Sequence, residues 1–144
     1  MNKAEPALLT VLLALVLATL AVRLTLGKYM ARSMTQLDCR LGYYGLLSFA
    51  TYAARPGTAE ENADWIAVSV ADGHFLFSKP SAPAHPMVVR RKLEAEGEGW
   101  NIVTEGCAFG GKDAYKEAMA QLPPVEKAVR EGGRGVELKV ELNR

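Results

Sequence analysis

The sequence predicts an α+β protein: an N-terminal transmembrane helix followed by a small domain with a mainly antiparallel β-sheet packed by helices. Three observations lead to this prediction. Residues 6–22 contain no charged side chain. Short β-rich segments farther along the chain are separated by turn signals. Glycine and proline pairs near the C-terminus bound two segments of helical character.

Length and composition limit the possible functions. The chain has 144 residues, enough for one domain beside the apolar segment. Its net charge of +1 comes from 17 basic and 16 acidic side chains, which excludes the strongly basic signature of a nucleic-acid-binding protein. Two cysteines are too few for a disulfide-dense scaffold or for a zinc site built only of cysteine.

The apolar N-terminal segment reads PALLTVLLALVLATLAV from Pro6 to Val22. About 20 apolar residues in a helix span a hydrocarbon core of about 30 Å. The segment reaches that length if Arg23 extends its charge to the headgroups and Lys28 and Tyr29 act as interfacial anchors. We therefore expect a short tail and transmembrane signal-anchor over residues 1–29 and a globular domain over residues 30–144.

Two other interpretations of this segment remain open. One is a cleaved secretory signal peptide, because Thr19-Leu20-Ala21 offers a small-residue cleavage site before Val22. The other is a buried helix of a soluble protein, although the segment has no polar face to turn toward water.

The side of the membrane on which the domain lies is also open. A short tail before a single span is typical of an uncleaved signal-anchor, which exports the following residues. This pattern predicts a single-pass protein of the bacterial inner membrane with a periplasmic domain. The basic residues Arg23, Lys28, Arg32 and Arg40 on the C-terminal side instead favour a cytoplasmic domain by the positive-inside rule.

The first half of the domain is expected to form one helix, a loop and a hairpin. Residues 30–54 show helical spacing, with a core-facing stripe of Met30, Met34, Leu37, Leu41, Tyr44, Leu47 and Thr51. Arg55-Pro56-Gly57 ends this helix, and residues 56–64 read as a polar loop. Strands over 65–71 and 74–78 flank Asp72-Gly73, a strong hairpin signal.

The second half is expected to begin with an extended loop over 79–86, because three prolines cannot join a strand ladder. A second hairpin follows, with strands over 87–93 and 100–104 across 94–99. Gly110-Gly111 opens a helix over 112–122, and Pro123-Pro124 starts a second helix that runs to Arg130. The alternating residues 136–142 predict a final strand.

Cys39 and Cys107 are the candidate disulfide. In an exported domain they would close a loop of about 70 residues and stabilise it by about 3–4 kcal/mol. In the cytoplasm they are two free thiols packed as small hydrophobic groups. Cys107 with His74 or His85 is a candidate nucleophile and base, but its surroundings, Glu105-Gly106-Cys107-Ala108-Phe109, match no local signature of a cysteine enzyme.

Other residues of possible chemical interest have simpler explanations. The carboxylates of Glu94, Glu96 and Glu98 are typical of a solvated turn rather than a calcium loop. Alternation within residues 90–92 turns Arg91 away from its basic neighbours, which argues against a phosphate site. Gly106, Gly110 and Gly111 fit neither a dinucleotide fingerprint nor a P-loop. Core or cross-strand positions are expected for the aromatic residues Trp65, Phe75, Phe77 and Trp100.

We therefore expect a non-enzymatic, single-pass membrane-anchored protein whose domain binds another protein at the bacterial envelope. It would serve as an accessory or assembly subunit, or as an inhibitor or immunity factor. We predict no cofactor, metal, nucleic acid or small-molecule substrate. A small thiol-dependent hydrolase using Cys107 is one alternative.

A pilin-like structural subunit is the other alternative. An apolar N-terminal helix leading into an antiparallel sheet resembles the outline of type IV pilins and pseudopilins, and Glu5 is suggestive. The resemblance implies a subunit whose apolar helix packs against copies of itself. The chain departs from that family because no glycine lies before a processing point and because Lys3 and Pro6 interrupt the apolar start.

Overall fold

The computed structural model describes residues 10–22, 34, 36–54, 56–129, 133 and 135–142. The chain divides into two units, Met1–Thr35 and Gln36–Arg144. Among the described residues, no helix combines the length and the apolar character that a membrane crossing requires. The short N-terminal tail and the predicted interfacial residues Arg23, Lys28 and Tyr29 lie outside the described residues.

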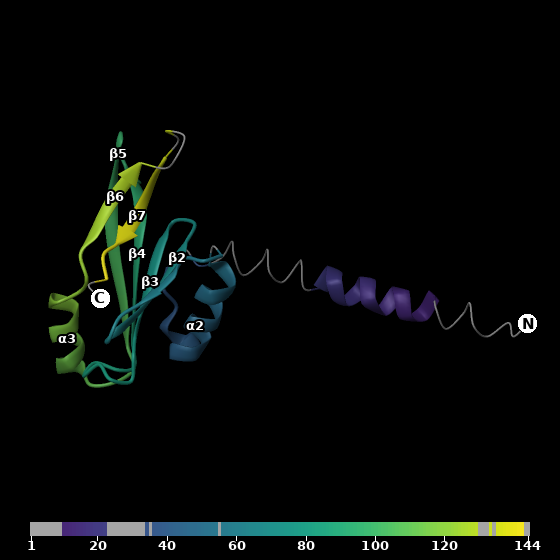
Figure 1. Cartoon of the computed structure of the whole chain (residues 1–144), viewed down its shortest axis with the longest axis horizontal. Coiled ribbons are helices and arrows are strands. Elements are labelled where there is room, and N and C mark those ends of the chain that lie inside the picture. The colour runs from purple at the N-terminus through teal and green to yellow at the C-terminus, as the bar shows by residue number, and fades with distance from the viewer. Residues whose placement is uncertain are drawn as a thin grey trace, which may run out of the picture. The chain divides into compact units, whose positions relative to one another are not determined.

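In the first unit, residues 10–22 are helical and are drawn in purple in Figure 1. Every residue of this helix is exposed. Its large apolar side chains are 54% to 60% exposed, and they are Val11, Leu12, Leu13, Leu15, Val16, Leu17, Leu20 and Val22. The Thr19 hydroxyl donates to the carbonyl oxygen of Val16 at 2.9 Å, so this polar group is satisfied within the helix.

The second unit is built on a five-stranded antiparallel sheet whose strands follow chain order. These strands are β1 (Ala59–Glu61), β2 (Trp65–Val70), β3 (Gly73–Ser78), β4 (Met87–Glu96) and β5 (Gly99–Ala108). A separate two-stranded sheet pairs β6 (Val125–Val129) with β7 (Val136–Val140). The helices are η1 (Cys39–Leu41), α2 (Gly42–Ala53) and α3 (Lys112–Ala120).

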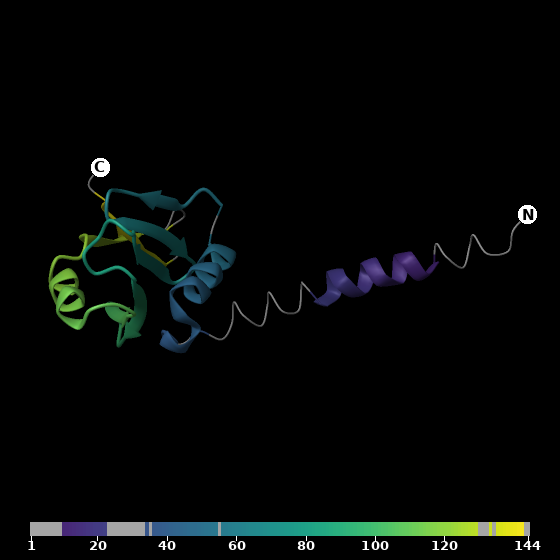
Figure 2. The same ribbon diagram turned by 90° about the horizontal axis from the view of Figure 1, so that it is seen from below.

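The large sheet is covered on both faces. Figures 1 and 2 show α2 on one face and α3 on the other, and the β6–β7 hairpin lies on the α3 side. Phe75 and Phe77 of β3 face α2, where Phe49 and Tyr43 meet their rings edge-on. Residues on the opposite face form a buried cluster with α3, and its members are Trp65, Ala67, Leu76, Ala84, Met87 and Val89. All six residues of β3 are consequently buried.

The fold confirms the predicted α+β class with a mainly antiparallel sheet. Both predicted hairpins form, although β4 and β5 extend to a two-residue turn at Gly97-Glu98. The hairpin loop between β2 and β3 is Ala71-Asp72, and Gly73 already pairs with Val70. Helix α3 and strand β7 lie where the sequence predicts them.

The predicted helix over residues 30–54 is shorter than expected. Met34 and residues 36–38 are not helical, and residues 30–33 lie outside the described part of the chain. The Asp38 side chain caps η1, and Gly42, with a φ of 70°, separates η1 from α2. The predicted core stripe is also wrong, because α2 buries Tyr43, Leu46 and Ala50 whereas Tyr44 is 76% exposed.

Three other segments differ from their predicted structure. The predicted second helix is strand β6, because residues 125–129 pair antiparallel with β7 and so satisfy the backbone groups of both strands. The predicted polar loop contains β1, an edge strand whose three residues are all exposed and therefore show no apolar pattern. Residues 79–86 form turns, with Ala82 N donating to Lys79 O at 2.9 Å and His85 N to Ala82 O at 3.0 Å.

Gly73 permits the close approach of β3 and β4. A Cβ at this position would overlap the carbonyl oxygen of Arg91 and lie 2.9 Å from the Cα of Lys92. We expect Gly73→Ala to destabilise the protein by at least about 2 kcal/mol, because the obstacle is backbone. Urea unfolding of the full chain in detergent, followed by tryptophan fluorescence, measures this loss.

Gly111→Ala is the matched control. An added Cβ at Gly111 meets nothing within 4 Å, and its φ of −68° suits any residue. We expect a change within about 0.5 kcal/mol. Equal stability of the two variants would contradict the proposed role of Gly73.

Candidate functional site

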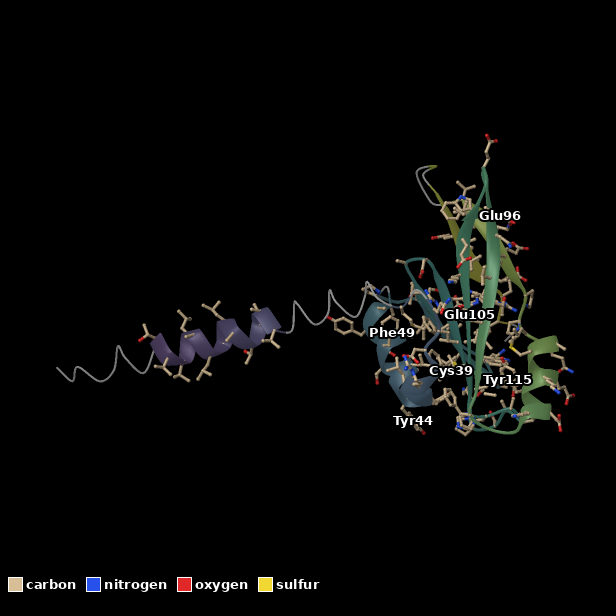
Figure 3. All side chains as sticks on the ribbon, turned by 180° about the vertical axis from the view of Figure 1, so that it is seen from behind. Cys39, Tyr44, Phe49, Glu96, Glu105 and Tyr115 are labelled. Carbon is tan, nitrogen blue, oxygen red and sulfur yellow. A yellow bond between two sulfur atoms is a disulfide. The ribbon has the colours of Figure 1, made fainter. Side chains whose placement is uncertain are left out.

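A disulfide between Cys39 of η1 and Cys107 of β5 joins the start of the helical cover to the sheet, with 5.5 Å between the two Cα atoms. This pair is the one that the sequence predicted. The backbone N–H of Leu37 donates to Glu105 Oε2 at 3.2 Å, next to the disulfide. Figure 3 shows Cys39 and Glu105 on neighbouring parts of the domain. The segment that leads into α2 is thus held to β5 by a covalent bond and a hydrogen bond.

The residues around Cys39 favour this geometry locally. Asp38 accepts from Arg40 N at 3.1 Å and from Arg40 Nε at 3.0 Å, which starts the single turn of η1. The hydrogen bond from the Arg40 side chain holds the pKa of Asp38 below its usual range. One turn later, the Tyr43 hydroxyl donates to Ser78 O at 2.7 Å. Burial raises the pKa of Tyr43.

The structure does not assemble the predicted thiol site. Cys107 is 1% exposed and its sulfur belongs to the disulfide, so it has no thiol. His74 faces the α3 side of the sheet whereas Cys107 faces the α2 side, as the strand register requires. His85 Nδ1 lies 2.8 Å from the carbonyl oxygen of Ser78. Neither histidine is therefore paired with Cys107.

Ser78 and His85 form a pair that sequence reasoning missed. Ser78 Oγ lies 3.4 Å from His85 Nδ1. The same oxygen accepts from Met87 N at 2.8 Å and donates to Met87 O at 3.1 Å, and Ser78 is fully buried. Because its hydroxyl bridges β3 and β4 inside the domain, Ser78 serves the fold and is not placed to attack a substrate.

Each basic residue of the run 90–92 is largely buried and has its own partners. Arg90 pairs with Asp72 at 3.0 Å and lies 5.7 Å from the ring centroid of Phe75. Arg91 donates to the carbonyl oxygen of Pro123. Lys92 pairs with Glu94 at 2.6 Å and approaches Glu105 at 3.9 Å. The run therefore links the sheet to its hairpin turn and to the C-terminal segment. Arg91 lies on the opposite face of the sheet from Arg90 and Lys92, as the alternation in the sequence predicted.

No described group of three histidine, cysteine, aspartate or glutamate residues is arranged to hold a metal ion. Glu94, Glu96 and Glu98 instead belong to an exposed end of the β4–β5 hairpin. We call residues 94–101 the hairpin tip; all of them are exposed. Trp100 in this tip is 45% exposed, unlike the buried Trp65, and its carbonyl accepts from Lys127 Nζ at 2.7 Å. Figure 3 shows Glu96 at the far end of the hairpin.

Two hollows lie beside the sheet. A cleft of about 180 Å³ between the 79–86 turns and α3 is lined by Asp64, Trp65, Ala82, Pro83, Ala84, Ala114, Glu117, Ala118 and Gln121. It is smaller than sites that enclose drug-sized ligands. A groove of about 410 Å³ separates β7 from β1 and β2, and its charged lining residues are Glu60, Glu137 and Lys139.

Compared with known proteins, the chain matches no family model, no curated protein and no solved structure. The function must therefore be inferred from the residues themselves.

Burial strongly lowers the pKa of one described side chain, that of His74. It is completely buried beside its strand partner Arg91, and neither ring nitrogen has a hydrogen-bond partner among the described residues. Burial and, to a lesser degree, the charge of Arg91 lower the pKa of His74 to about 4. His74 is therefore neutral at pH 7 in the folded protein.

We expect the stability conferred by neutral His74 to be complete above about pH 6.5 and to be lost as pH falls toward 4, because the unfolded chain binds the proton more tightly. The loss amounts to about 3 kcal/mol. Urea unfolding between pH 7 and 4 should show a steeper decline for the wild type than for His74→Leu, which lacks the titrating group. Parallel profiles for the two proteins would contradict this assignment, because all carboxylates are common to both.

Proposed function

We propose that this chain is a non-enzymatic, single-pass membrane-anchored protein whose α+β domain binds another protein at the bacterial envelope. The observation that carries the proposal is the helix over residues 10–22, which exposes apolar side chains on all sides. A helix that is apolar all round is stable when lipid or protein covers it. The uncharged sequence continues N-terminally to Pro6, and the segment reaches the length of about 20 residues that a span needs if Arg23 extends its charge to the headgroups.

The disulfide supports a periplasmic location for the domain. Structural disulfides persist in oxidising compartments and are rare in the cytosol. Cys39 lies at the surface, where a cytosolic reductant would reach it, whereas Cys107 is buried. The domain therefore suits the periplasmic side of the inner membrane.

The hairpin tip is the surface that we propose for the protein partner. It extends beyond the helices that cover the sheet (Figure 1). It combines the exposed Trp100 ring with three carboxylates, those of Glu94, Glu96 and Glu98. Tryptophan is enriched among residues that dominate protein interfaces. By the strand register, Glu94 and Glu96 lie on the opposite face of the hairpin from Trp100, so a partner that contacts both the ring and these carboxylates would enclose the end of the hairpin with a basic surface. An accessory subunit, an inhibitor or an immunity factor would each use such a surface.

Trp100→Ala should lower capture of the partner about tenfold in membranes treated with a chemical cross-linker, because it removes the aromatic anchor. Glu96→Lys should weaken capture as well. Glu117→Lys makes the same charge change on exposed α3 and should leave capture unchanged. Mass spectrometry of the cross-linked material identifies the partner as a different chain.

Two outcomes would contradict the proposal. Cross-linked ladders made only of this chain, recovered from sheared surface material, would favour the pilin-like alternative, in which the exposed apolar helix packs on its own copies. Capture of the same partner by wild type and Trp100→Ala would exclude the hairpin tip as the binding surface.

A further inference from the structure

Helix α2 has no charged residue in its twelve positions. A helix on the surface of a soluble domain usually carries charges on its outer face. In α2, Tyr43, Leu46 and Ala50 cover the sheet. The opposite side carries the exposed residues Tyr44, Ser48 and Tyr52 at helical spacing, and Leu41, the last residue of η1, is also exposed. We call these four residues the outer stripe. This helix is therefore suited to being covered on both sides.

The residues of the outer stripe suit the boundary between lipid and water. Tyr44 is 76% exposed and Tyr52 is 62% exposed, while Leu41 is 48% exposed. Figure 3 shows Tyr44 projecting away from the sheet. Tyrosine has an apolar ring and a polar hydroxyl, and it is enriched at membrane interfaces for this reason. Helix α2 contains no aspartate or glutamate, so anionic headgroups would not repel it through a carboxylate.

The sequence between the apolar helix and α2 favours a membrane as the surface that covers the outer stripe. Only 18 residues lie between Val22 and Leu41, so a fully extended connection spans at most about 65 Å. Residues 23–37 contain Arg23, Lys28 and Arg32 and no acidic residue. Each basic residue near an anionic bilayer contributes about 1 kcal/mol of attraction. The length of the connection limits how far α2 can lie from the bilayer, and its basic residues would draw it toward anionic headgroups.

We propose that the outer stripe of α2 lies in the headgroup layer of an anionic bilayer. This inference rests on the membrane anchoring proposed above. It gives the domain a defined orientation, because α3 covers the opposite face of the sheet and is then turned away from the membrane (Figure 2). The anchored domain would thus meet its partner with a fixed set of surfaces.

The test uses the full chain reconstituted in vesicles of phosphatidylglycerol and phosphatidylethanolamine in equal parts. Tyr44 is replaced by the photo-reactive residue p-benzoylphenylalanine, which keeps an aromatic ring at an exposed position. The control carries the same residue in place of Lys116, which is exposed on α3. After illumination, mass spectrometry should detect several-fold more lipid adduct at position 44 than at position 116.

A second substitution distinguishes contact between the outer stripe and the headgroups from simple proximity of the domain to the bilayer. Tyr52→Glu places a negative charge in the outer stripe at an exposed position, and it should lower the lipid adduct at position 44 several-fold. Glu117→Lys, on α3, should leave that adduct unchanged. An adduct at position 44 that is insensitive to Tyr52→Glu would overturn the proposal.

A carbonate wash of the same vesicles distinguishes the inference from the proposed function. Protein that stays in the washed vesicles but gives equal lipid adduct at both positions overturns the role of α2 and leaves the anchoring intact. Protein that the wash releases overturns the anchoring itself. Adducts between position 44 and a second copy of the chain, in place of lipid, would identify the outer stripe as a protein interface and overturn the proposal.

Discussion

The Cys39–Cys107 disulfide holds the segment that leads into α2 against strand β5. The architecture of the domain depends on this link, because α2 covers one face of the sheet. The disulfide closes a loop between residues 68 apart in the sequence, which limits the unfolded chain and stabilises the fold by about 4 kcal/mol. It also holds η1, the turn that precedes α2, against β5. After this turn, Tyr43 reaches Ser78 and Phe77, and α2 shields the aromatic face of β3. The other face is covered by α3 and the β6–β7 hairpin, so the central strand is buried from both sides.

The basic residues 90–92 of β4 lie at the boundary between the buried and the exposed parts of the β4–β5 hairpin. Met87, Val88 and Val89 are fully buried apolar residues, and residues 90–92 are buried basic ones. A buried cation is costly unless it is paired, and here carboxylates, a carbonyl oxygen and an aromatic ring supply the partners. From Glu94 onward every residue as far as Asn101 is exposed. One hairpin thus contributes both to the core and to the projecting surface that we propose for partner binding.

Much of the fold follows from local sequence signals. Alternation and turn residues predicted both hairpins, and the Gly110-Gly111 and Pro123-Pro124 pairs predicted α3. The disulfide was predicted from Cys39 and Cys107 as the only two cysteines. Three features depend on tertiary contacts and were missed: β1 is a polar edge strand, β6 pairs with β7 instead of forming a helix, and α2 carries no charge on either side. Because no charged residue marks the outer side of α2, periodicity alone selected Tyr44 for the core instead of Tyr43. The three glutamates of the hairpin tip predicted a solvated turn, but the sequence did not predict that Trp100 is exposed.

Redox-dependent labelling in living cells tests the central claim, a disulfide-closed domain on the periplasmic side of the membrane, most directly. Intact cells are treated with a membrane-impermeant maleimide, with and without prior exposure to an impermeant phosphine reductant; lysed, reduced and denatured cells give the full signal. We predict labelling of intact cells only after reduction, at Cys39, which is exposed. Labelling that requires lysis, or that needs no reduction, would contradict the account.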